Sequence, residues 1–191
     1  HIFTFLNKWP NWEKNFINII GESFSGKTHL INIFLKKYKG AKFISNNFND
    51  ENLNQIKIFE NIIIEDIDRN IDEKIIYSLI NTIERDNKFL IVTSKEPIVD
   101  INFTLPDLKS RFKNFLLFNI EKPDDDLMFA LILKNLSDRQ ISLNKKLIDY
   151  IIKRVDRSYS KIFDFIYKID QLSLKKKRSI DLKIIKEVLG E

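Results

Sequence analysis

A short glycine-containing loop lies between an apolar run and an amphipathic segment near the start of the chain. Residues 21–28 read Gly-Glu-Ser-Phe-Ser-Gly-Lys-Thr, a complete G-x-x-x-x-G-K-[ST] pattern in a chain with only 4 glycines among 191 residues. The run 16–20 is typical of a buried strand, and 28–37 repeats apolar residues at helical spacing. Strand, loop and helix start in this order bring backbone N–H groups and a positive helix end to one point, where a polyphosphate binds. The sequence therefore predicts a phosphate-binding (Walker A) loop.

This loop supplies most of the predicted nucleotide site. We expect Lys27 to contact the β- and γ-phosphate oxygens and Thr28 to ligate Mg²⁺ through its hydroxyl. The predicted cofactors are ADP or ATP with Mg²⁺. His29 is interpreted as packing at the helix start instead of taking part in catalysis. Trp9 and Trp12 are interpreted as capping the core edge, with a place near the adenine as the alternative. The residues predicted to contact the nucleotide here are Gly21, Glu22, Ser23, Phe24, Ser25, Gly26, Lys27, Thr28 and His29.

Composition bounds the class of protein. A length of 191 residues suits one domain or a domain with a small satellite, and the absence of cysteine excludes a disulfide framework. No run approaches the roughly 20 apolar residues that a membrane span needs, so we expect a soluble, cytoplasmic protein without membrane contact. The net charge of +5 allows a nucleic-acid partner, but a solvated loop is the favoured interpretation of the basic run 175–178, which follows an expected helix end.

The order of the expected elements divides the chain at Pro123. Before it, strands alternate with helices, of which 72–85 has the clearest apolar spacing; the expected strands are 16–20, 41–45, 62–65, 89–93 and 115–120. This alternation predicts an α/β fold with a central parallel sheet flanked by helices. After it only helices are expected, at 124–135, 144–154, 158–173 and 181–189. We therefore predict a nucleotide-binding α/β core at 1–120 and a small all-α lid at 121–191.

An acidic strand end would complete a phosphate site. The run 61–68 is an apolar strand that delivers carboxylates at its C-terminal end, where ligands bind in open α/β sheets. We expect Glu65 to hold Mg²⁺ directly or through water, and Asp66 to orient a water as a catalytic residue. A strand that merely ends in solvated acids is the alternative, which the intact loop makes less attractive.

Two further side chains are candidates by position. Ser94 follows the apolar run 89–93, so its hydroxyl could contact the γ-phosphate or the attacking water, although serine at a strand end is also an ordinary turn residue. Arg111 lies in a short helix-like segment, 105–112. Delivered to the γ-phosphate of a neighbouring subunit it would stabilise transition-state charge; otherwise it is a surface arginine.

The order of these motifs resembles the initiator-type AAA+ proteins of the DnaA/Hda family. The resemblance spans nearly the whole chain, and its specific parts are the Pro-Asp-Leu-x-Ser-Arg stretch and the tail. The matching segments are Gly21…Gly26-Lys27-Thr28-His29-Leu30, Glu65-Asp66-Ile67-Asp68, Leu105-Pro106-Asp107-Leu108…Ser110-Arg111-Phe112, 169–189 and Trp9-Pro10-Asn11-Trp12. The resemblance implies an AAA+ core with a small helical lid.

Two features favour the Hda branch over DnaA itself. Only 36 residues separate Thr28 from Glu65, which leaves no room for the helical insertion with which the DnaA initiators grip single-stranded DNA. The sequence also ends after Val188 and Leu189, where DnaA would continue into a helix-turn-helix domain. Direct sequence-specific DNA binding is therefore not expected.

Two departures from the family pattern bear on catalysis. Glu65 stands where the family usually has aspartate, and Ser160 followed by Lys161 stands at the usual lid sensor arginine. Both lower the expected rate of intrinsic ATP hydrolysis while leaving nucleotide contacts at Ser160 and Lys161 open. The resemblance thus implies a regulator that promotes hydrolysis of DnaA-bound ATP, with Arg111 as an arginine finger.

Other functions and partners stay open. The alternatives are an autonomous AAA+ ATPase, such as a helicase loader or initiator core fragment, and a non-hydrolysing interaction module. By resemblance the partners are DnaA and the DNA-loaded sliding clamp, although no clamp-binding peptide is visible before Trp9. Self-association is a further alternative.

Overall fold

The computed structural model describes residues 2–191, which divide into two compact units. The first unit contains the chain up to Glu22 together with Gly26–Ile120. The second contains Glu121–Glu191, and the three loop residues Ser23–Ser25 group with it. Within the described chain, the helices are too short or too polar to cross a membrane.

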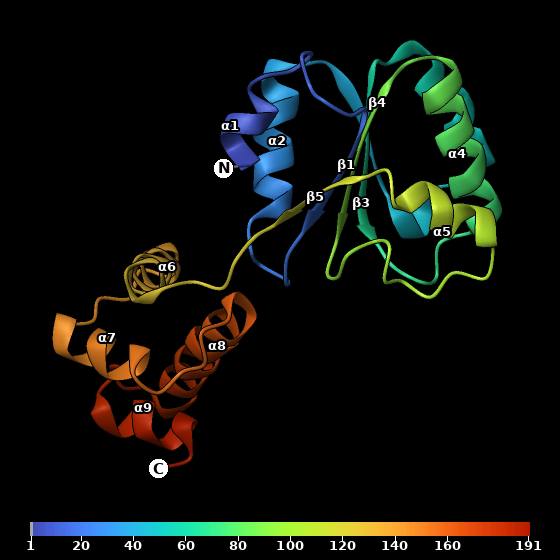
Figure 1. The fold of residues 1–191 in the computed structure, drawn as a ribbon. Helices are drawn as coiled ribbons and strands as arrows, with labels where there is room; N and C mark the ends of the chain where they lie inside the picture. Colours follow the sequence, from blue (N-terminus) through green and yellow to red (C-terminus); the bar gives the residue numbers. More distant parts are fainter. Residues whose placement is uncertain (1) are drawn as a thin grey trace. The chain divides into compact units, whose positions relative to one another are not determined.

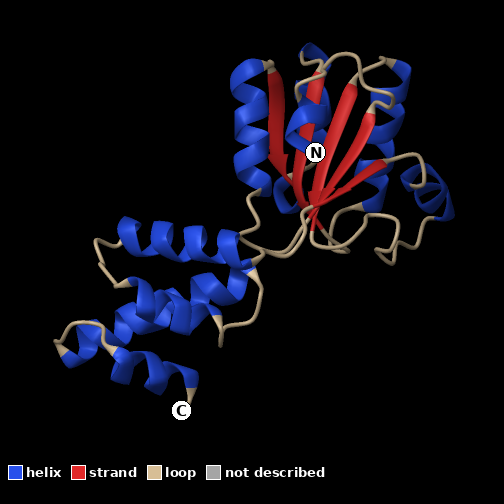
Figure 2. Cartoon of the chain, turned by 60° about the vertical axis from the view of Figure 1, so that its left-hand side comes forward, coloured by secondary structure: helices blue, strands red, loops and turns tan. Residues whose placement is uncertain are grey.

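The first unit is built on one parallel sheet with strand order β2-β3-β4-β1-β5 (Figure 2). Its strands are β1 (Phe16–Ile20), β2 (Gly40–Ile44), β3 (Asn61–Ile67), β4 (Phe89–Ser94) and β5 (Leu116–Asn119). Its helices are α1 (Ile2–Leu6), α2 (Lys27–Lys37), α3 (Asp50–Gln55), α4 (Glu73–Arg85) and α5 (Pro106–Phe112), with 3₁₀ turns at Ser45–Asn47 and Ile56–Ile58. The predicted parallel sheet flanked by helices is confirmed.

Helices cover both faces of this sheet (Figure 1). Helices α1 and α2 pack on one face, against a set of buried side chains that includes Ile17, Ile19, Ile63 and Ile91. Helices α4 and α5 cover the other face, against a set that includes Ile62, Ile64, Leu90 and Val92. Strands buried on both faces need apolar residues at every position, which explains the continuous apolar runs in the sequence.

The second unit contains four helices, α6 (Asp125–Asp138), α7 (Lys145–Ile152), α8 (Tyr159–Lys176) and α9 (Leu182–Leu189). Each begins after a capping side chain that accepts a hydrogen bond from a backbone N–H of the first turn: Asp124, Asn144, Ser158 and Asp181. Their apolar stripes meet in one core, which includes Met128, Ile132, Ile148, Ile166 and Ile184.

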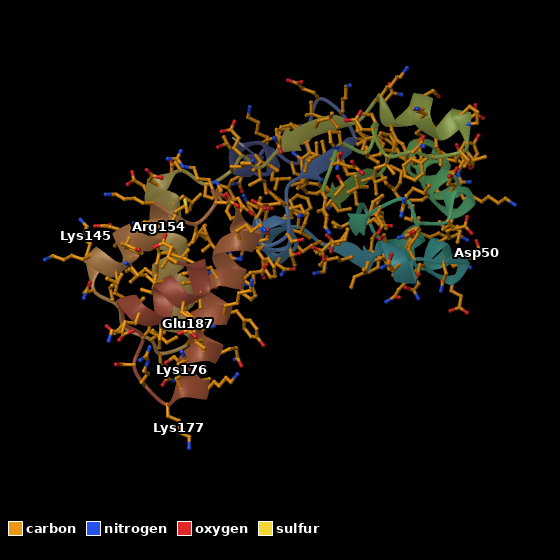
Figure 3. All side chains as sticks on the ribbon, turned by 90° about the horizontal axis from the view of Figure 1, so that it is seen from below. Asp50, Lys145, Arg154, Lys176, Lys177 and Glu187 are labelled. Atoms are coloured by element: carbon orange, nitrogen blue, oxygen red, sulfur yellow. The ribbon has the colours of Figure 1, made fainter. Side chains whose placement is uncertain are left out.

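The end of α8 differs from the sequence prediction. The helix runs to Lys176 instead of ending at Ser173, so the expected basic loop is in part the last helical turn. Lys177 then adopts a left-handed conformation (φ 52°) as the C-cap, and Lys176 forms an ion pair with Glu187 of α9 (Figure 3). Lysines in the last turn of a helix interact favourably with the negative end of the helix dipole, which accounts for the extension of α8 to Lys176.

Candidate functional site

The predicted phosphate loop connects β1 to α2. Gly26 has φ 94° and ψ 10°, a left-handed conformation that side-chain-bearing residues rarely adopt. It is also the N-cap residue of α2, and no side chain caps this helix. The N–H groups of the first turn are therefore left for another acceptor, and the positive end of the helix dipole adds to their attraction for an anion.

Lys27 is the buried cation of this loop. Only 7% of the residue is exposed, and Nζ donates to the carbonyl oxygens of Gly21 at 2.6 Å and Glu22 at 3.0 Å. Burial lowers the pKa of Lys27, whereas the nearby carboxylate of Asp66 raises it. The cation of Lys95, which the sequence analysis did not single out, also lowers the pKa of Lys27. A buried ammonium whose described hydrogen bonds go to neutral carbonyls is well placed to attract an anion.

The three residues in the middle of the loop, Ser23–Ser25, group with the second unit by their contacts. Phe24 has φ 66° and is exposed over 57% of its surface, and its ring stacks on Phe163 with 4.2 Å between the ring centroids. Ser25 is buried, and its Oγ has no hydrogen-bond partner within residues 2–191. Their contacts with a nucleotide, and that of Ser23, stay predictions.

Asp66 occupies an irregular position near the end of β3. The pairing of β3 with β4 shifts register between Ile64 and Ile67, and Asp66 has φ 57°. Its N–H donates to Thr93 Oγ1 at 2.9 Å, and its carbonyl accepts from Ser45 Oγ at 2.6 Å. A left-handed aspartate held from both sides turns its carboxylate outward, and Asp66 is accordingly exposed.

Glu65, the predicted metal ligand, is buried and already paired. Its Oε2 lies 3.1 Å from Nζ of Lys42, and 6% of the side chain is exposed. Its Oε1 has no hydrogen-bond partner in the described chain. Thr28, the other predicted ligand, is exposed, and no three His, Cys, Asp or Glu side chains of residues 2–191 come together as a metal site. The loop fits a polyphosphate, whereas a carboxylate already paired with an ammonium fits Mg²⁺ poorly.

Ser94 belongs to a buried polar network. Its hydroxyl accepts from Asn18 Nδ2 at 2.8 Å and donates to the carbonyl of Glu96 at 2.6 Å. Asn18 Oδ1 accepts from the N–H of Ile98 at 2.9 Å. Asn18 thus ties β1 to the loop after β4. Asn18 was not among the site residues predicted from the sequence, although a single asparagine within an apolar strand is a visible signal.

Arg111, the finger candidate, lies on α5 against α4 of its own chain. Its guanidinium forms an ion pair with Glu84, and the guanidinium carbon lies 5.1 Å from the centre of the Tyr77 ring. A quarter of the Arg111 side chain is exposed (25%). Arg111 therefore lies partly exposed at the surface of the first unit and is paired within its own chain.

The remaining candidates are spread over both units. Ser160 and Lys161 lie in the first turn of α8, where the N–H of Lys161 donates to Ser158 Oγ at 3.3 Å. Their contacts with a nucleotide stay predictions. His29 is exposed in the first turn of α2, contrary to its interpretation as a packing residue. The aromatic segment before β1 packs into the core instead, where Trp12 stacks on Phe5 with 5.3 Å between ring centroids.

A glycine loop after β1, an acidic end of β3 and a parallel sheet followed by a four-helix unit together define a P-loop AAA+ protein. Comparison with known proteins narrows the class. Residues 124–189 match the family model for the lid domain of Hda. The chromosomal replication initiator protein DnaA of Thermoanaerobacter sp. (strain X514) is 26% identical over 189 residues, which is 87% of this chain and 43% of that protein.

Solved structures agree on the fold. Domain III of the Thermotoga maritima replication initiation protein DnaA has a TM-score of 0.76 at 20% identity, covering 100% of this chain and 89% of the other. AMPPCP-bound DnaA from Aquifex aeolicus has a TM-score of 0.63 at 22% identity, covering 86% of this chain and 56% of the other.

The chain thus has an AAA+ fold, resembles the lid domain of Hda over residues 124–189, and is similar in sequence to DnaA over most of its length. The resemblance expected from the motifs is confirmed at this level. The chain spans 43% to 47% of the length of three DnaA relatives that it matches, so their activities are not transferred to it directly.

Proposed function

We propose that the loop from Gly21 to Thr28 holds an adenine nucleotide. The observation that carries this proposal is the buried ammonium of Lys27 beside the uncapped start of α2. An anion that reached both would pair the ammonium and accept from the first-turn N–H groups. A solved protein of the same fold, DnaA from Aquifex aeolicus, is described as AMPPCP-bound, which supports an adenine nucleotide as the ligand.

Calorimetric titration with ADP and with ATP tests this proposal. We expect Lys27→Met to weaken nucleotide binding by about 10- to 100-fold, the usual effect of losing one hydrogen bond to a charged group. The matched control is Lys36→Met, an exposed lysine of the same helix, which should stay within about twofold of the unmodified chain. Absence of heat and of a thermal shift with both nucleotides would instead favour the interaction module.

We further propose that the chain promotes hydrolysis of DnaA-bound ATP, with Arg111 acting on the nucleotide of the partner. Kinship with the Hda lid and with DnaA supports this role. The partly exposed position of Arg111 on a short surface helix supports it too, because a finger must reach another subunit. Glu65, already paired with Lys42, argues against fast hydrolysis at the chain's own loop.

The assay is turnover of DnaA-ATP with DNA-loaded sliding clamp, in the presence and absence of this chain. Arg111→Ala should lower the stimulation of DnaA-ATP turnover by at least about tenfold, because arginine fingers contribute large rate factors. Arg85→Ala is the control, because Arg85 is an exposed arginine that is paired with Asp86 at the end of α4. Equal stimulation by the unmodified chain and Arg111→Ala would end the finger role.

An autonomous ATPase is the second candidate, and the geometry of Asp66 favours it. Asp66 is a non-glycine residue held at φ 57° by a hydrogen bond from its N–H to Thr93 Oγ1 and one from Ser45 Oγ to its carbonyl, the kind of strained position found at active sites. This function predicts ATP turnover by the chain alone that is lost in Asp66→Asn. Turnover below detection with Mg-ATP, with or without DNA, rules it out.

The remaining partners are also proposals. A clamp contact would recruit the chain to replicating DNA, and self-association would offer Arg111 to a second copy of the same loop. A role beside DnaA would place the chain in the cytoplasm. Size-exclusion chromatography with and without ADP, and pull-down by the purified clamp, distinguish these partners.

A further inference from the structure

Lys42 is a residue that the phosphate-loop pattern does not contain. It lies in β2, where Lys42 pairs with Ile63 and Ile44 pairs with Glu65 in the parallel ladder. Its side chain leaves the sheet on the same face as Glu65, two positions along, and reaches toward α2. Nζ lies 3.1 Å from Glu65 Oε2 and 3.0 Å from Asn32 Oδ1.

The ammonium of Lys42 lies beside one of the two predicted metal ligands. Asn32 is four residues after Thr28 on α2, so the two side chains are neighbours on one helix face, one turn apart. The ammonium of Lys42 therefore binds one predicted Mg²⁺ ligand, Glu65, and lies one helical turn from the other, Thr28. A cation is therefore already bound to one of the two predicted metal ligands.

A divalent ion would compete with this ammonium. Mg²⁺ needs near-octahedral oxygen ligands, and Oε2 of Glu65 already contacts a positive charge. A second cation beside Lys42 would also be repelled by it. The ammonium, a compact charge with three donors, neutralises the buried carboxylate without those geometric demands.

We propose that Lys42 takes the place of Mg²⁺ as the fixed positive charge beside Glu65, so that the chain binds its nucleotide without a divalent cation. This inference rests on the proposed nucleotide binding. It makes Lys42 a positioning and charge-supplying residue of that site. It also accounts for the longer side chain at position 65, because glutamate reaches an ammonium delivered from the neighbouring strand.

A purely structural role for the ion pair is the competing explanation. A buried carboxylate such as Glu65, with 6% of its side chain exposed, needs a partner in any protein. Loss of stability on removing Lys42 therefore does not decide between the two roles. Dependence of nucleotide affinity on Mg²⁺ does decide, because a structural pair would leave that dependence unchanged.

The experiment titrates the chain with fluorescent ADP in excess Mg²⁺ and in EDTA. The unmodified chain should bind with affinities within about threefold in the two conditions, and Lys42→Met should gain at least about tenfold from Mg²⁺. Lys42→Arg keeps the charge and should behave like the unmodified chain. Lys36→Met is the control for removing a lysine of the same unit, and circular dichroism checks that each variant is folded.

The inference is overturned if the unmodified chain gains about tenfold or more from Mg²⁺ and Lys42→Met gains the same. If the unmodified chain binds no ADP in either condition, the proposed nucleotide binding fails, and titration with Mn²⁺ alone, followed by electron paramagnetic resonance, decides the inference separately. Tighter Mn²⁺ binding by Lys42→Met than by the unmodified chain supports it. Equal binding that Glu65→Gln abolishes in both contradicts it.

Discussion

The guanidinium of Arg111 on α5 forms an ion pair with the carboxylate of Glu84 on α4. The residue proposed to act on a partner is therefore held on its own chain. Both side chains are at the surface, with 25% of Arg111 and 42% of Glu84 exposed. Exposed pairs of this kind contribute about 0–1 kcal/mol, so Arg111 can leave Glu84 when a more strongly charged partner is offered.

Removing the carboxylate should make Arg111 more available. We predict that Glu84→Gln lowers the concentration of chain needed for half-maximal stimulation of DnaA-ATP turnover by up to about fivefold, the equivalent of about 1 kcal/mol. Asp86→Asn, which breaks the neighbouring pair with Arg85, is the control and should change nothing. A weaker stimulation by Glu84→Gln would show that Glu84 positions Arg111 for the reaction instead of restraining it.

The buried network around Asn18 should be costly to disrupt. Asn18→Ala removes the donor to Ser94 Oγ, which keeps its hydrogen bond to Glu96, and leaves the buried N–H of Ile98 without its acceptor. We predict a loss of about 2–3 kcal/mol in the free energy of unfolding, measured with urea. Asn15→Ala removes an exposed hydrogen bond to Asn87 and should cost less than about 1 kcal/mol. Similar losses for the two variants would contradict the network's role.

The sequence predicted the sheet and the loop because each depends on local pattern. Runs such as 62–64 are apolar at every position since both faces of the sheet are covered. Helices α1 and α3 were not predicted, for a physical reason in each case. Helix α1 has only 5 residues, and α3 reads Asp-Glu-Asn-Leu-Asn-Gln, which has no apolar stripe. Tertiary packing stabilises the first, and the capping box of Asn49 stabilises the second.

The charges of the candidate site could not be predicted in the same way. The pair of Lys42 with Glu65 depends on the register of β2 against β3, which the sequence does not contain. The pair of Arg111 with Glu84 likewise joins two helices that are 20 residues apart at their nearest ends. Local pattern thus identified which residues carry the chemistry, and only the fold showed what each is bound to.

A second acidic residue of α4 should make stability depend on pH. The carboxylate of Glu73 accepts from the N–H of Thr104 at 2.8 Å and of Leu105 at 2.7 Å, and the hydrogen bond from Thr104 is the main cause that lowers the pKa of Glu73 below its ordinary value of 4.5. A lowered pKa contributes stability that is present above pH 4.5 and is lost as the pH falls through the folded-state value.

The variant Glu73→Gln tests this contribution. It should lower the free energy of unfolding at neutral pH by about 1 kcal/mol, and the difference from the unmodified chain should shrink as the pH falls through the lowered pKa of Glu73. Urea unfolding over a range of pH values measures both effects, with the exposed Glu60→Gln as the control. A difference that is the same at every pH would show that the charge of Glu73 plays no part.

Two glycines of the first unit should respond to alanine for different reasons. At Gly40, in β2, an added Cβ would lie 2.6 Å from the carbonyl oxygen of Asn61 and 2.9 Å from Leu35 Cδ2, so the backbone itself must move. At Gly26 an added Cβ would meet nothing within 4 Å, and the cost comes from φ 94° alone. We predict losses of about 2–3 kcal/mol for Gly40→Ala and about 1–2 kcal/mol for Gly26→Ala, measured by urea unfolding.

Nucleotide affinity should rank the same two variants in the opposite order. Gly40 is remote from the phosphate loop, so Gly40→Ala should leave ADP affinity within about twofold wherever the chain is folded. Gly26→Ala strains the N-cap residue of α2 and should therefore displace the first-turn N–H groups that are proposed to hold the phosphates. We expect ADP binding to weaken by about tenfold or more. Titration with ADP under conditions where both variants are folded measures this. Equal affinities would mean that the left-handed conformation of Gly26 serves the fold and not the ligand.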